Sequence, residues 1–509
     1  MVSTSGPGRD GGSVPAVLRS PSALRVEVLA GLVVALALIP EAISFSVIAG
    51  VDPRVGLFAS FTMAVTIAVT GGRRAMISAA TGAVALVIAP VVREHGLDYL
   101  IATVILAGVF QVVLSVAGVA KLMRFVPRSV MVGFVNALAI LIFTAQLPHL
   151  LGVPWLVYPL VAVALAIIVL LPKLTTVVPA PLVAIVVLTA AAMVFTLDVP
   201  NVGDEGELPS SLPSLLVPHV PWTLDTLKII APYALAMALV GLMESLMTAK
   251  LVDDITDTHS DKTREGWGQG VANIVTGFFG GMGGCAMIGQ TMINVKVSGA
   301  RTRISTFLAG VFLLILVVGL GGLVAKIPMA ALVAVMIMVS VGTFDWHSIA
   351  PKTLRRMPIA ETTVMAATVV VTVATHNLAI GVVVGVLTAM IAFAHRVAHF
   401  TAVTPVPDTD TSGGTRTGSE PETRVYKVRG ELFFASSNDL VYQFDYTGDP
   451  AHIVIDMSDT HIWDASTVAA LDAITTKYAA KGKTVEIIGL NPASEARHGR
   501  LSGHLAGAH

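Results

Sequence analysis

Apolar stretches follow one another from Val26 to about Phe400, separated by Gly, Pro and short charged clusters. A straight helix needs roughly 20 apolar residues to cross the hydrocarbon core of a bilayer. Six stretches have about this length: 98–120, 127–148, 153–171, 178–197, 226–248 and 303–325. The chain is 54% hydrophobic and 13% charged, against about 45–50% and about 25% in soluble domains. The sequence therefore predicts a polytopic α-helical membrane protein surrounded by a lipid bilayer.

Eight further segments complete this part of the chain: 27–47, 55–70, 76–92, 266–282, 285–299, 329–343, 361–376 and 378–396. Three of them are short or interrupted. The first contains Pro40-Glu41, the segment 76–92 is short, and 285–299 is rich in Gly, Asn and Lys. We expect broken or half helices at these three places. The total of fourteen transmembrane segments puts both termini on one side of the membrane.

The distribution of Lys and Arg predicts the orientation, because positively charged loops stay cytoplasmic. With a cytoplasmic N-terminus, nineteen Lys and Arg residues fall inside and four fall outside, namely Arg54, Arg93, Lys228 and Lys326. We therefore expect a multi-pass protein of the plasma (inner) membrane with both termini in the cytoplasm. A cleaved signal peptide is disfavoured, because Pro40-Glu41 interrupts the first stretch and no small-residue cleavage pattern precedes a soluble domain.

Composition divides the chain into four parts. Residues 1–24, rich in Gly, Ser and Pro, predict a flexible cytoplasmic tail, and 25–400 form the transmembrane domain. Residues 401–423, rich in Pro, Thr, Asp and Gly, predict a linker. In residues 424–509 we expect strands at 425–428, 432–435, 453–457 and 484–490, and a helix at 466–480. Strands alternating with a helix predict a small cytoplasmic α/β domain.

Several function classes are disfavoured. A net charge of −1 lacks the basic balance with which nucleic-acid-binding proteins neutralise phosphates, so we expect no nucleic-acid partner. The single cysteine, Cys285, excludes an internal disulfide and a cysteine-based zinc site, and we interpret it as a small packing residue with no base beside it. No P-loop pattern supports ATP-driven pumping, and no catalytic constellation indicates an enzyme.

Two carboxylates lie inside apolar segments, where a charge costs roughly 2.5–3.5 kcal/mol on insertion scales. Glu41 lies in the first segment and Glu244 in the eighth. Fourteen segments divide into seven plus seven, so these two positions are equivalent if the halves repeat, as the usually inverted halves of many transporters do. Glu244 and Thr248 are four residues apart and share a helix face. Together they could bind Na+ or, with Glu244 protonated, carry H+; the alternative is a hydrogen-bonded structural glutamate.

The third and tenth segments correspond in the same way, and both begin with small residues, at 77–83 and 283–291. A half-helix that begins in the middle of the membrane presents free N–H groups and about half a positive charge at its N-terminus. Two such ends facing one another would bind an anion without a lysine. The alternative is that the small residues only allow helices to pack closely.

Residues 38–45, LIPEAISF, resemble the first-helix motif of the sulfate permease (SulP) family of anion transporters. Further similarity lies in its ninth and tenth helices and the loop that follows: Gly268-Gln269-Gly270, Asn273, Gly280-Gly281, 291–294, Gly299 and 301–303. Residues 430–435, Asp456 and 464–466 resemble the STAS domain that is shared with anti-sigma-factor antagonists. The resemblance covers almost the whole chain from about residue 22.

The resemblance implies fourteen spans in two inverted repeats, which form a core and a gate domain, and a homodimer. It also implies that the substrate is held between the N-termini of the third and tenth helices. This assigns substrate binding to residues Thr81, Gly82, Ala83, Ala286, Met287 and Ile288. In sodium-coupled bicarbonate transporters of the family, the positions of Glu244 and Thr248 look like the cation site.

Two positions depart from the family pattern. Many members have Gln where this chain has Glu41, which favours proton coupling here. Many also have a Ser-Arg pair where this chain has Gly289-Gln290, so one fixed positive charge is missing. In the second domain, Ser466 matches a position that is phosphorylated in some antagonist proteins. A serine that begins a helix is, however, an N-cap first, and we favour the cap.

We therefore expect a secondary active transporter of a small inorganic oxyanion, sulfate or bicarbonate, that works by alternating access. The coupling ion is H+ or Na+, with Glu41 and Glu244 as coupling residues and no other cofactor. Alternatives are an anion channel, a membrane anion sensor that signals through the STAS-like domain, and, less favoured, a purine or pyrimidine carrier of the same architecture.

Overall fold

The computed structural model describes residues 14–118, 126–174, 179–398, 401–406 and 423–504. The chain divides into two compact units, Met1–Val386, here called the membrane unit, and Leu387–His509, the C-terminal unit. The boundary between them falls within a single helix, α17 (Leu378–Ala398).

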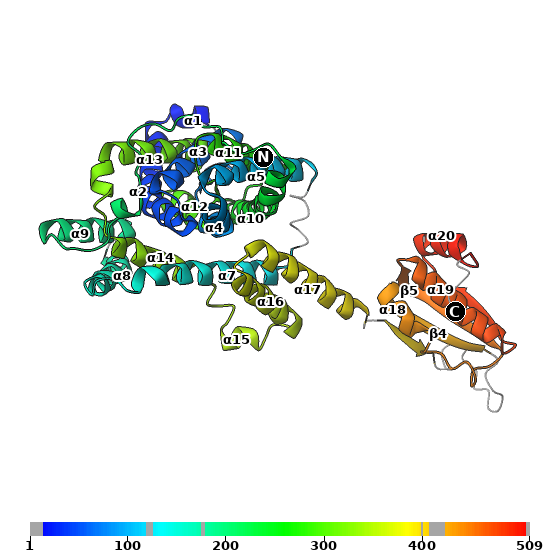
Figure 1. Ribbon diagram of the computed structural model, residues 1–509. Helices are drawn as coiled ribbons and strands as arrows, with labels where there is room; N and C mark the ends of the chain where they lie inside the picture. The colour runs from blue at the N-terminus through cyan, green and yellow to red at the C-terminus, as the bar shows by residue number, and fades with distance from the viewer. Residues whose placement is uncertain (1–13, 119–125, 175–178, 399–400, 407–422, 505–509) are drawn as a thin grey trace, which may run out of the picture. The chain divides into compact units, whose positions relative to one another are not determined.

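Helices make up almost all of the membrane unit, and each of the fourteen predicted segments contains one in the described residues (Figure 1). In chain order its elements before α17 are α1 (Val14–Leu18), α2 (Pro21–Ala49), α3 (Pro53–Thr70), β1 (Ser78–Ala79), α4 (Gly82–His95), α5 (Leu97–Val116), α7 (Arg128–Gln146), η2 (Leu147–Leu150), α8 (Val157–Leu174), α9 (Ala180–Val194), η3 (Val202–Glu205), α10 (Leu224–Thr256), α11 (Lys262–Phe278), β2 (Cys285–Ala286), α12 (Ile288–Met292), the π-helical η4 (Ile293–Val297), α13 (Arg303–Val324), α14 (Met329–Thr343), α15 (Pro351–Leu354) and α16 (Ile359–Thr375).

Hydropathy and length agree with a membrane location. Among the described residues, eight helices are long and apolar enough to cross a bilayer, and α9, α14 and α16 are shorter apolar helices. Charged residues are sparse within these helices because the bilayer offers them no water. The prediction of a helical membrane protein is confirmed.

Two groups of helices form the membrane unit. Helices α2–α5 pack with α10–α13, whereas α7, α8, α9, α14 and α16 pack on one another (Figure 1). Each group takes helices from both halves of the chain, as the expected core and gate domains require. We refer to them as the core group and the gate group.

Close helix contacts in the core group depend on small residues. On α5, a Cβ added at Gly108 would lie 2.5 Å from the carbonyl oxygen of Gly270 on α11, and one added at Gly270 would lie 2.6 Å from that of Gly108. Such mutual approach is the packing role of small residues in membrane helices. These two glycines therefore allow α5 and α11 to pack closely.

The first segment differs from its prediction. We expected Pro40-Glu41 to break it, but α2 is one continuous helix of 29 residues that includes Pro40. Proline removes one backbone hydrogen bond, and neighbouring helices and Ser or Thr side chains compensate for this in membrane helices. The Ser44 hydroxyl donates to the Pro40 carbonyl at 2.8 Å, whereas the acceptor that Pro40 leaves without its helical partner is the carbonyl of Leu36, four residues earlier.

The third and tenth segments are half helices, as predicted. The two-residue strands β1 and β2 precede α4 and α12 and pair antiparallel, with Ser78 opposite Ala286 and Ala79 opposite Cys285. We call this pairing the strand crossing. It is buried on all sides, so the backbone groups of an extended segment inside the membrane satisfy one another.

The C-terminal unit contains a four-stranded sheet with the order β3-β4-β5-β6. After α17 its elements are β3 (Ala402–Pro405), β4 (Thr423–Leu432), α18 (Phe434–Leu440), β5 (His452–Ile462), α19 (Ala465–Ala479), β6 (Thr484–Ile488) and α20 (Pro492–Leu501). β3 pairs antiparallel with β4, and the other pairs are parallel. The α/β prediction is confirmed with two corrections. The expected strand 432–435 instead ends β4 and begins α18, and part of the expected linker forms β3.

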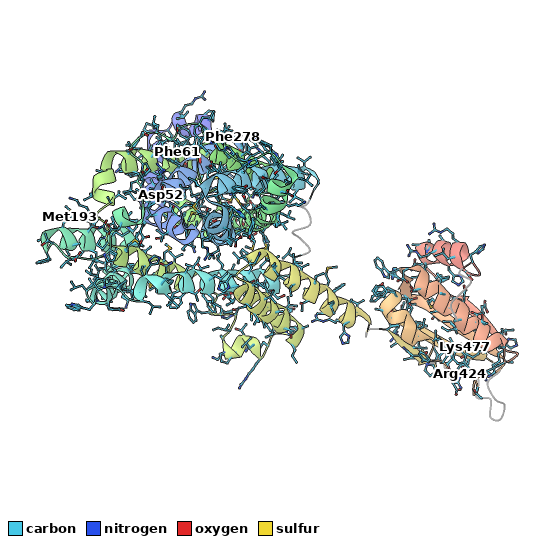
Figure 2. All side chains as sticks on the ribbon, viewed as in Figure 1. Asp52, Phe61, Met193, Phe278, Arg424 and Lys477 are labelled. Atoms are coloured by element: carbon cyan, nitrogen blue, oxygen red, sulfur yellow. The ribbon has the colours of Figure 1, made fainter. Side chains whose placement is uncertain are left out.

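The interior of this unit combines apolar residues with the buried acid Asp449. Tyr426 and Tyr478 both donate hydrogen bonds to the carboxylate of Asp449, at 2.9 Å and 2.5 Å. Nearby, Nζ of Lys477, which is labelled in Figure 2, lies 5.3 Å from the ring centroid of Tyr446. The tyrosine hydroxyls thus supply the hydrogen bonds that a buried carboxylate needs.

Candidate functional site

The strand crossing brings the N-termini of α4 and α12 together. Thr81 caps α4, because its Oγ1 accepts a hydrogen bond from the Val84 N–H. The first N–H groups of a helix have no partner within it, and here they belong to Gly82 and Ala83 of α4 and to Ile288 and Gly289 of α12. They form a concentration of partial positive charge within the apolar interior.

Helix α11 holds both strands of the crossing with two side chains four residues apart. Gln269 Nε2 donates to Ser78 Oγ of β1 at 2.6 Å. Asn273 binds both main-chain groups of Gly284, just before β2: its Oδ1 accepts from the Gly284 N–H at 2.9 Å, and its Nδ2 donates to the carbonyl at 3.0 Å. Both side chains are fully buried. The strand crossing is therefore held in place by α11 as well as by the pairing of β1 with β2.

Glycine is required at Gly284, where another main-chain segment approaches closely, and Gly82 leaves room for two neighbouring side chains. A Cβ at Gly284 would lie 1.9 Å from the Ala79 carbonyl oxygen. A Cβ at Gly82 would lie 3.0 Å from the Phe45 ring and 3.1 Å from Ile142. The close approach sets the separation of the two helix ends.

A cavity of about 440 Å³ lies in front of these helix ends, between the core and gate groups. Its lining from the core group comprises Glu41, Phe45, Thr81, Gly82, Ala83, Glu244, Met247, Met287, Ile288 and Gly289. Its lining from the gate group comprises Phe134, Val135, Leu138, Ile142, Val339, Gly342 and Thr343. We call this space the central cavity. Five of the six residues assigned to substrate binding line it; Ala286 does not, and is fully buried, with its N–H donating to Ser245 Oγ.

Glu41 reaches the central cavity from α2. Its Oε1 accepts a hydrogen bond from Nε2 of Gln290, the third residue of α12, at 2.9 Å. Sequence reasoning treated Glu41 and Gln290 as two separate departures from the family pattern. The structure joins them in one contact.

Glu244 reaches the same cavity from α10. The Cys285 thiol donates to its Oε2 at 2.7 Å, so the expectation that no base lies beside Cys285 is wrong. The residue is fully buried in the core, as a small packing residue is. Thr248 is fully buried and its hydroxyl donates to the main-chain carbonyl of Glu244, not to the carboxylate. Thr248 lies one helical turn away from Glu244 and does not line the central cavity.

The charge of the central cavity comes from carboxylates. Among the described residues that line it, Glu41 and Glu244 are the ionisable side chains, and no Lys, Arg or His accompanies them. In the part of the chain that the structure describes, neither glutamate takes part in an ion pair. An anion here meets helix N-termini in place of cationic side chains.

The gate wall of the cavity was not found from the sequence. The residues from α7 and α14 are apolar or small, and their segments read as ordinary membrane helices. Gly342 illustrates the difficulty, because a Cβ built on it meets no atom within 4 Å and would project into open space. Only the packing of the two helix groups identifies such a residue.

The position of Ser466 also differs from its prediction. Asp464, not Ser466, caps α19, with its Oδ1 accepting from the Thr467 N–H at 3.1 Å. Ser466 lies in the first turn and is exposed. The N-cap interpretation is wrong, because the carboxylate of Asp464, two residues earlier, already occupies that role.

Comparison with known sequences gives the family. The pattern of the sulfate permease family matches residues 24–158 and 154–368. The chain belongs to the sulfate permease family. A STAS domain matches residues 416–503. The family resemblance and the domain type are thereby confirmed.

Among relatives of this chain, YbaR of Bacillus subtilis, named for sulfate transport, is 53% identical over 473 residues, covering 93% of this chain and 96% of YbaR. The bicarbonate transporter BicA of a Picosynechococcus species is 27% identical over 513 residues, covering 92% of this chain and 88% of BicA. The chain is accordingly a member of an anion transporter family and not an enzyme.

Solved structures agree with this assignment. The transmembrane domain of a cyanobacterial BicA matches with a TM-score of 0.62 at 25% identity, covering 70% of this chain and 97% of that chain. The murine anion transporter Slc26a9 in its inward-facing state matches with a TM-score of 0.79 at 17% identity, covering 95% and 88%. The second likeness concerns the fold alone.

Proposed function

We propose that this member of the sulfate permease family is a secondary active transporter that moves a small inorganic oxyanion, sulfate or bicarbonate, across the plasma (inner) membrane with H+ or Na+ as coupling ion. One observation carries the proposal. The free N–H ends of α4 and α12 and the carboxylates of Glu41 and Glu244 line the same cavity.

The helix ends provide the anion with its binding site. Each contributes roughly half a positive charge, and the glycines of the first turns let an oxyanion approach the N–H groups directly. The apolar walls exclude water and so strengthen these dipoles. The anion exchanges its hydration shell for backbone donors that are fixed by the strand crossing.

The carboxylates make anion binding depend on a cation. Two unit negative charges about 6 Å apart repel by about 3 kcal/mol at an effective dielectric constant of about 20, which corresponds to about a hundredfold in affinity. Because the described lining carries no basic side chain, an ionised glutamate opposes the anion unless H+ or Na+ accompanies it. For Na+ we propose the Glu244 carboxylate, with the Thr248 hydroxyl one turn away.

Alternating access follows from the place of the cavity between two helix groups. The core group carries the helix ends and both glutamates, and the gate group supplies the apolar wall. Movement of the core group against the gate group carries the anion past the wall, as in other repeat-built transporters. Both termini lie in the cytoplasm, the protein works as a homodimer, and the STAS domain supports assembly or regulation, with the exposed Ser466 as a regulatory site.

The test is uptake into liposomes that contain the purified full-length protein. Labelled sulfate and bicarbonate are supplied separately under imposed pH or Na+ gradients, with Glu41→Gln and Glu244→Gln beside the wild type. We expect uphill uptake driven by one gradient and loss of that drive in at least one variant. Unchanged coupling in both variants contradicts the assigned roles of the glutamates. Conductance far above carrier turnover contradicts the transporter and indicates a channel, and binding without net flux indicates a sensor.

A further inference from the structure

The contact between Glu41 and Gln290 is incomplete. Gln290 is 3% exposed, and its Nε2 donates to Glu41 Oε1 at 2.9 Å. Its own carbonyl oxygen, Oε1, is buried and has no hydrogen-bond partner among the described residues. A primary amide offers both a donor and an acceptor, and here only the donor is used. An unpaired buried acceptor is unfavourable, which indicates a missing donor.

Glu41 can supply that donor only in one protonation state. An ionised carboxylate accepts hydrogen bonds and donates none, whereas a protonated carboxyl group has one O–H donor and keeps an acceptor. With a proton on Oε2, Glu41 donates to Gln290 Oε1 while Oε1 of Glu41 continues to accept from Nε2. The two planar groups then form a closed pair with two hydrogen bonds, and no buried polar atom of Gln290 is left unpaired.

Other charged groups near α2 do not compensate for Glu41. The elements packed against α2 carry the ionisable residues Arg54, Arg93, Glu94, His95, Lys296 and Arg303, and α2 itself carries Arg25 and Glu27. None of these lines the central cavity. The other carboxylate of the cavity, Glu244, is held by the Cys285 thiol. Glu41 thus faces an amide, apolar side chains and a second acid.

We propose that Glu41 and Gln290 form the proton-binding site of the transport cycle, in which the proton is held in a carboxylic acid–amide pair. A proton from the aqueous phase adds to Oε2 of Glu41 and removes a negative charge from the central cavity. Gln290 is the third residue of α12, whose first turn lines the anion site. The closed pair therefore ties α2 to α12 when the proton is bound. On deprotonation one of the two hydrogen bonds is lost and the charge returns.

This inference rests on the proposed function and selects H+ as the coupling ion. The experiment uses the wild type and the variants Glu41→Gln, Gln290→Met and the exchange Glu41→Gln with Gln290→Glu. The exchange rebuilds an acid–amide pair with the partners interchanged. Gln146→Met is the matched control, because Gln146 is a buried glutamine of α7 whose amide donates to Ile142 within its own helix.

In liposomes at fixed membrane potential, we expect an inward proton gradient to accelerate anion uptake by the wild type and by Gln146→Met. Glu41→Gln should lose this acceleration, and Gln290→Met should weaken it about fivefold, the effect of one hydrogen bond between neutral groups worth about 1 kcal/mol. The exchange should recover it. An exchange variant that stays as insensitive as Glu41→Gln overturns the proposal, as does a Gln290→Met variant with undiminished acceleration.

Infrared spectroscopy of the purified protein gives a readout that does not depend on transport. The wild type should show a carbonyl band of a protonated carboxyl group that disappears in Glu41→Gln and shifts in Gln290→Met, where the second hydrogen bond is absent. If this carbonyl band has the same frequency in Gln290→Met as in the wild type, the acid–amide pair is contradicted. Wild-type protein that transports neither anion contradicts the proposed function instead, so the two failures are distinguishable.

Discussion

The Sγ atom of Cys285 lies 2.7 Å from Oε2 of Glu244 and donates a hydrogen bond to it. The same sulfur lies 3.1 Å from Oγ1 of Thr81. Because the thiol proton is directed to Glu244, the Thr81 hydroxyl is the donor of the second bond. One buried thiol thus connects the carboxylate of α10 with the cap of α4, through strand β2.

Two substitutions of Cys285 distinguish the contribution of its hydrogen bond to stability from the contribution of its volume. Cys285→Ala leaves the Glu244 carboxylate without its donor, and we expect a loss of about 1–3 kcal/mol in stability. Cys285→Ser retains a donor of similar size and should lose less. Thermal unfolding of the two purified variants measures the difference. If serine is as destabilising as alanine, the contact is packing alone.

The strand crossing should not tolerate a side chain at Gly284. Gly284→Ala places a Cβ 1.9 Å from the Ala79 carbonyl, so the two strands must separate. We expect loss of anion uptake and of a monodisperse elution profile. Gly322→Ala on α13 is the control, because a Cβ there meets no atom within 4 Å. Normal uptake by Gly284→Ala would show that the helix ends do not need their close approach.

Gly342 should determine the size of the anion that the central cavity admits. A valine there projects into open space rather than into a neighbour, so the fold should persist while the cavity becomes smaller. We expect sulfate uptake to fall more than bicarbonate uptake, by about tenfold, since steric exclusion of one substrate is worth roughly 1–3 kcal/mol. Competition between the two anions in one uptake assay measures the ratio. An unchanged ratio contradicts a selective role of this wall.

The C-terminal unit should lose stability at alkaline pH. Burial raises the pKa of Tyr446 to about 12, and burial together with the hydrogen bond to Asp449 raises the pKa of Tyr478. Above pH about 10 tyrosines of the unfolded chain lose protons that the folded unit keeps, so stability falls as pH rises. The protection of the β4 and β5 amides against hydrogen exchange, relative to the intrinsic base-catalysed rate, should fall there in the full-length protein. Asp449→Asn, which removes the carboxylate, should weaken the dependence.

Much of the architecture could be predicted because bilayer thickness imposes a length on each segment. The same reasoning failed at α2. Pro40 would break a helix in water, but here tertiary contacts sustain the helix. Small residues at Thr81–Ala83 and around Met287 correctly indicated half helices. Their sequence spacing, however, carries no information about which side chains meet.

Contacts between residues far apart in the sequence were therefore the main feature that the sequence analysis did not predict. The pairs Glu41 with Gln290 and Glu244 with Cys285 are separated by 249 and 41 positions and form only when the helices pack. The gate residues were missed for the same reason, because Gly342 on α14 looks like any helix glycine. At α19 the error was local, since Asp464 and Ser466 lie two positions apart and Asp464 is the residue that caps the helix.

The strand crossing also imposes an order on biosynthesis. Ile77 donates its N–H to the Thr291 hydroxyl, a partner 214 positions later in the chain. While the ribosome is still synthesising the second half of the chain, the main chain around β1 has no hydrogen-bond partner inside the lipid. Peptide groups without hydrogen bonds are strongly disfavoured there. The third segment must therefore stay sheltered, by the translocon or at the water boundary, until the tenth emerges. The anion site is then completed among the last steps of insertion. A chain truncated before residue 285 lacks β2 and therefore does not form an open pathway across the membrane.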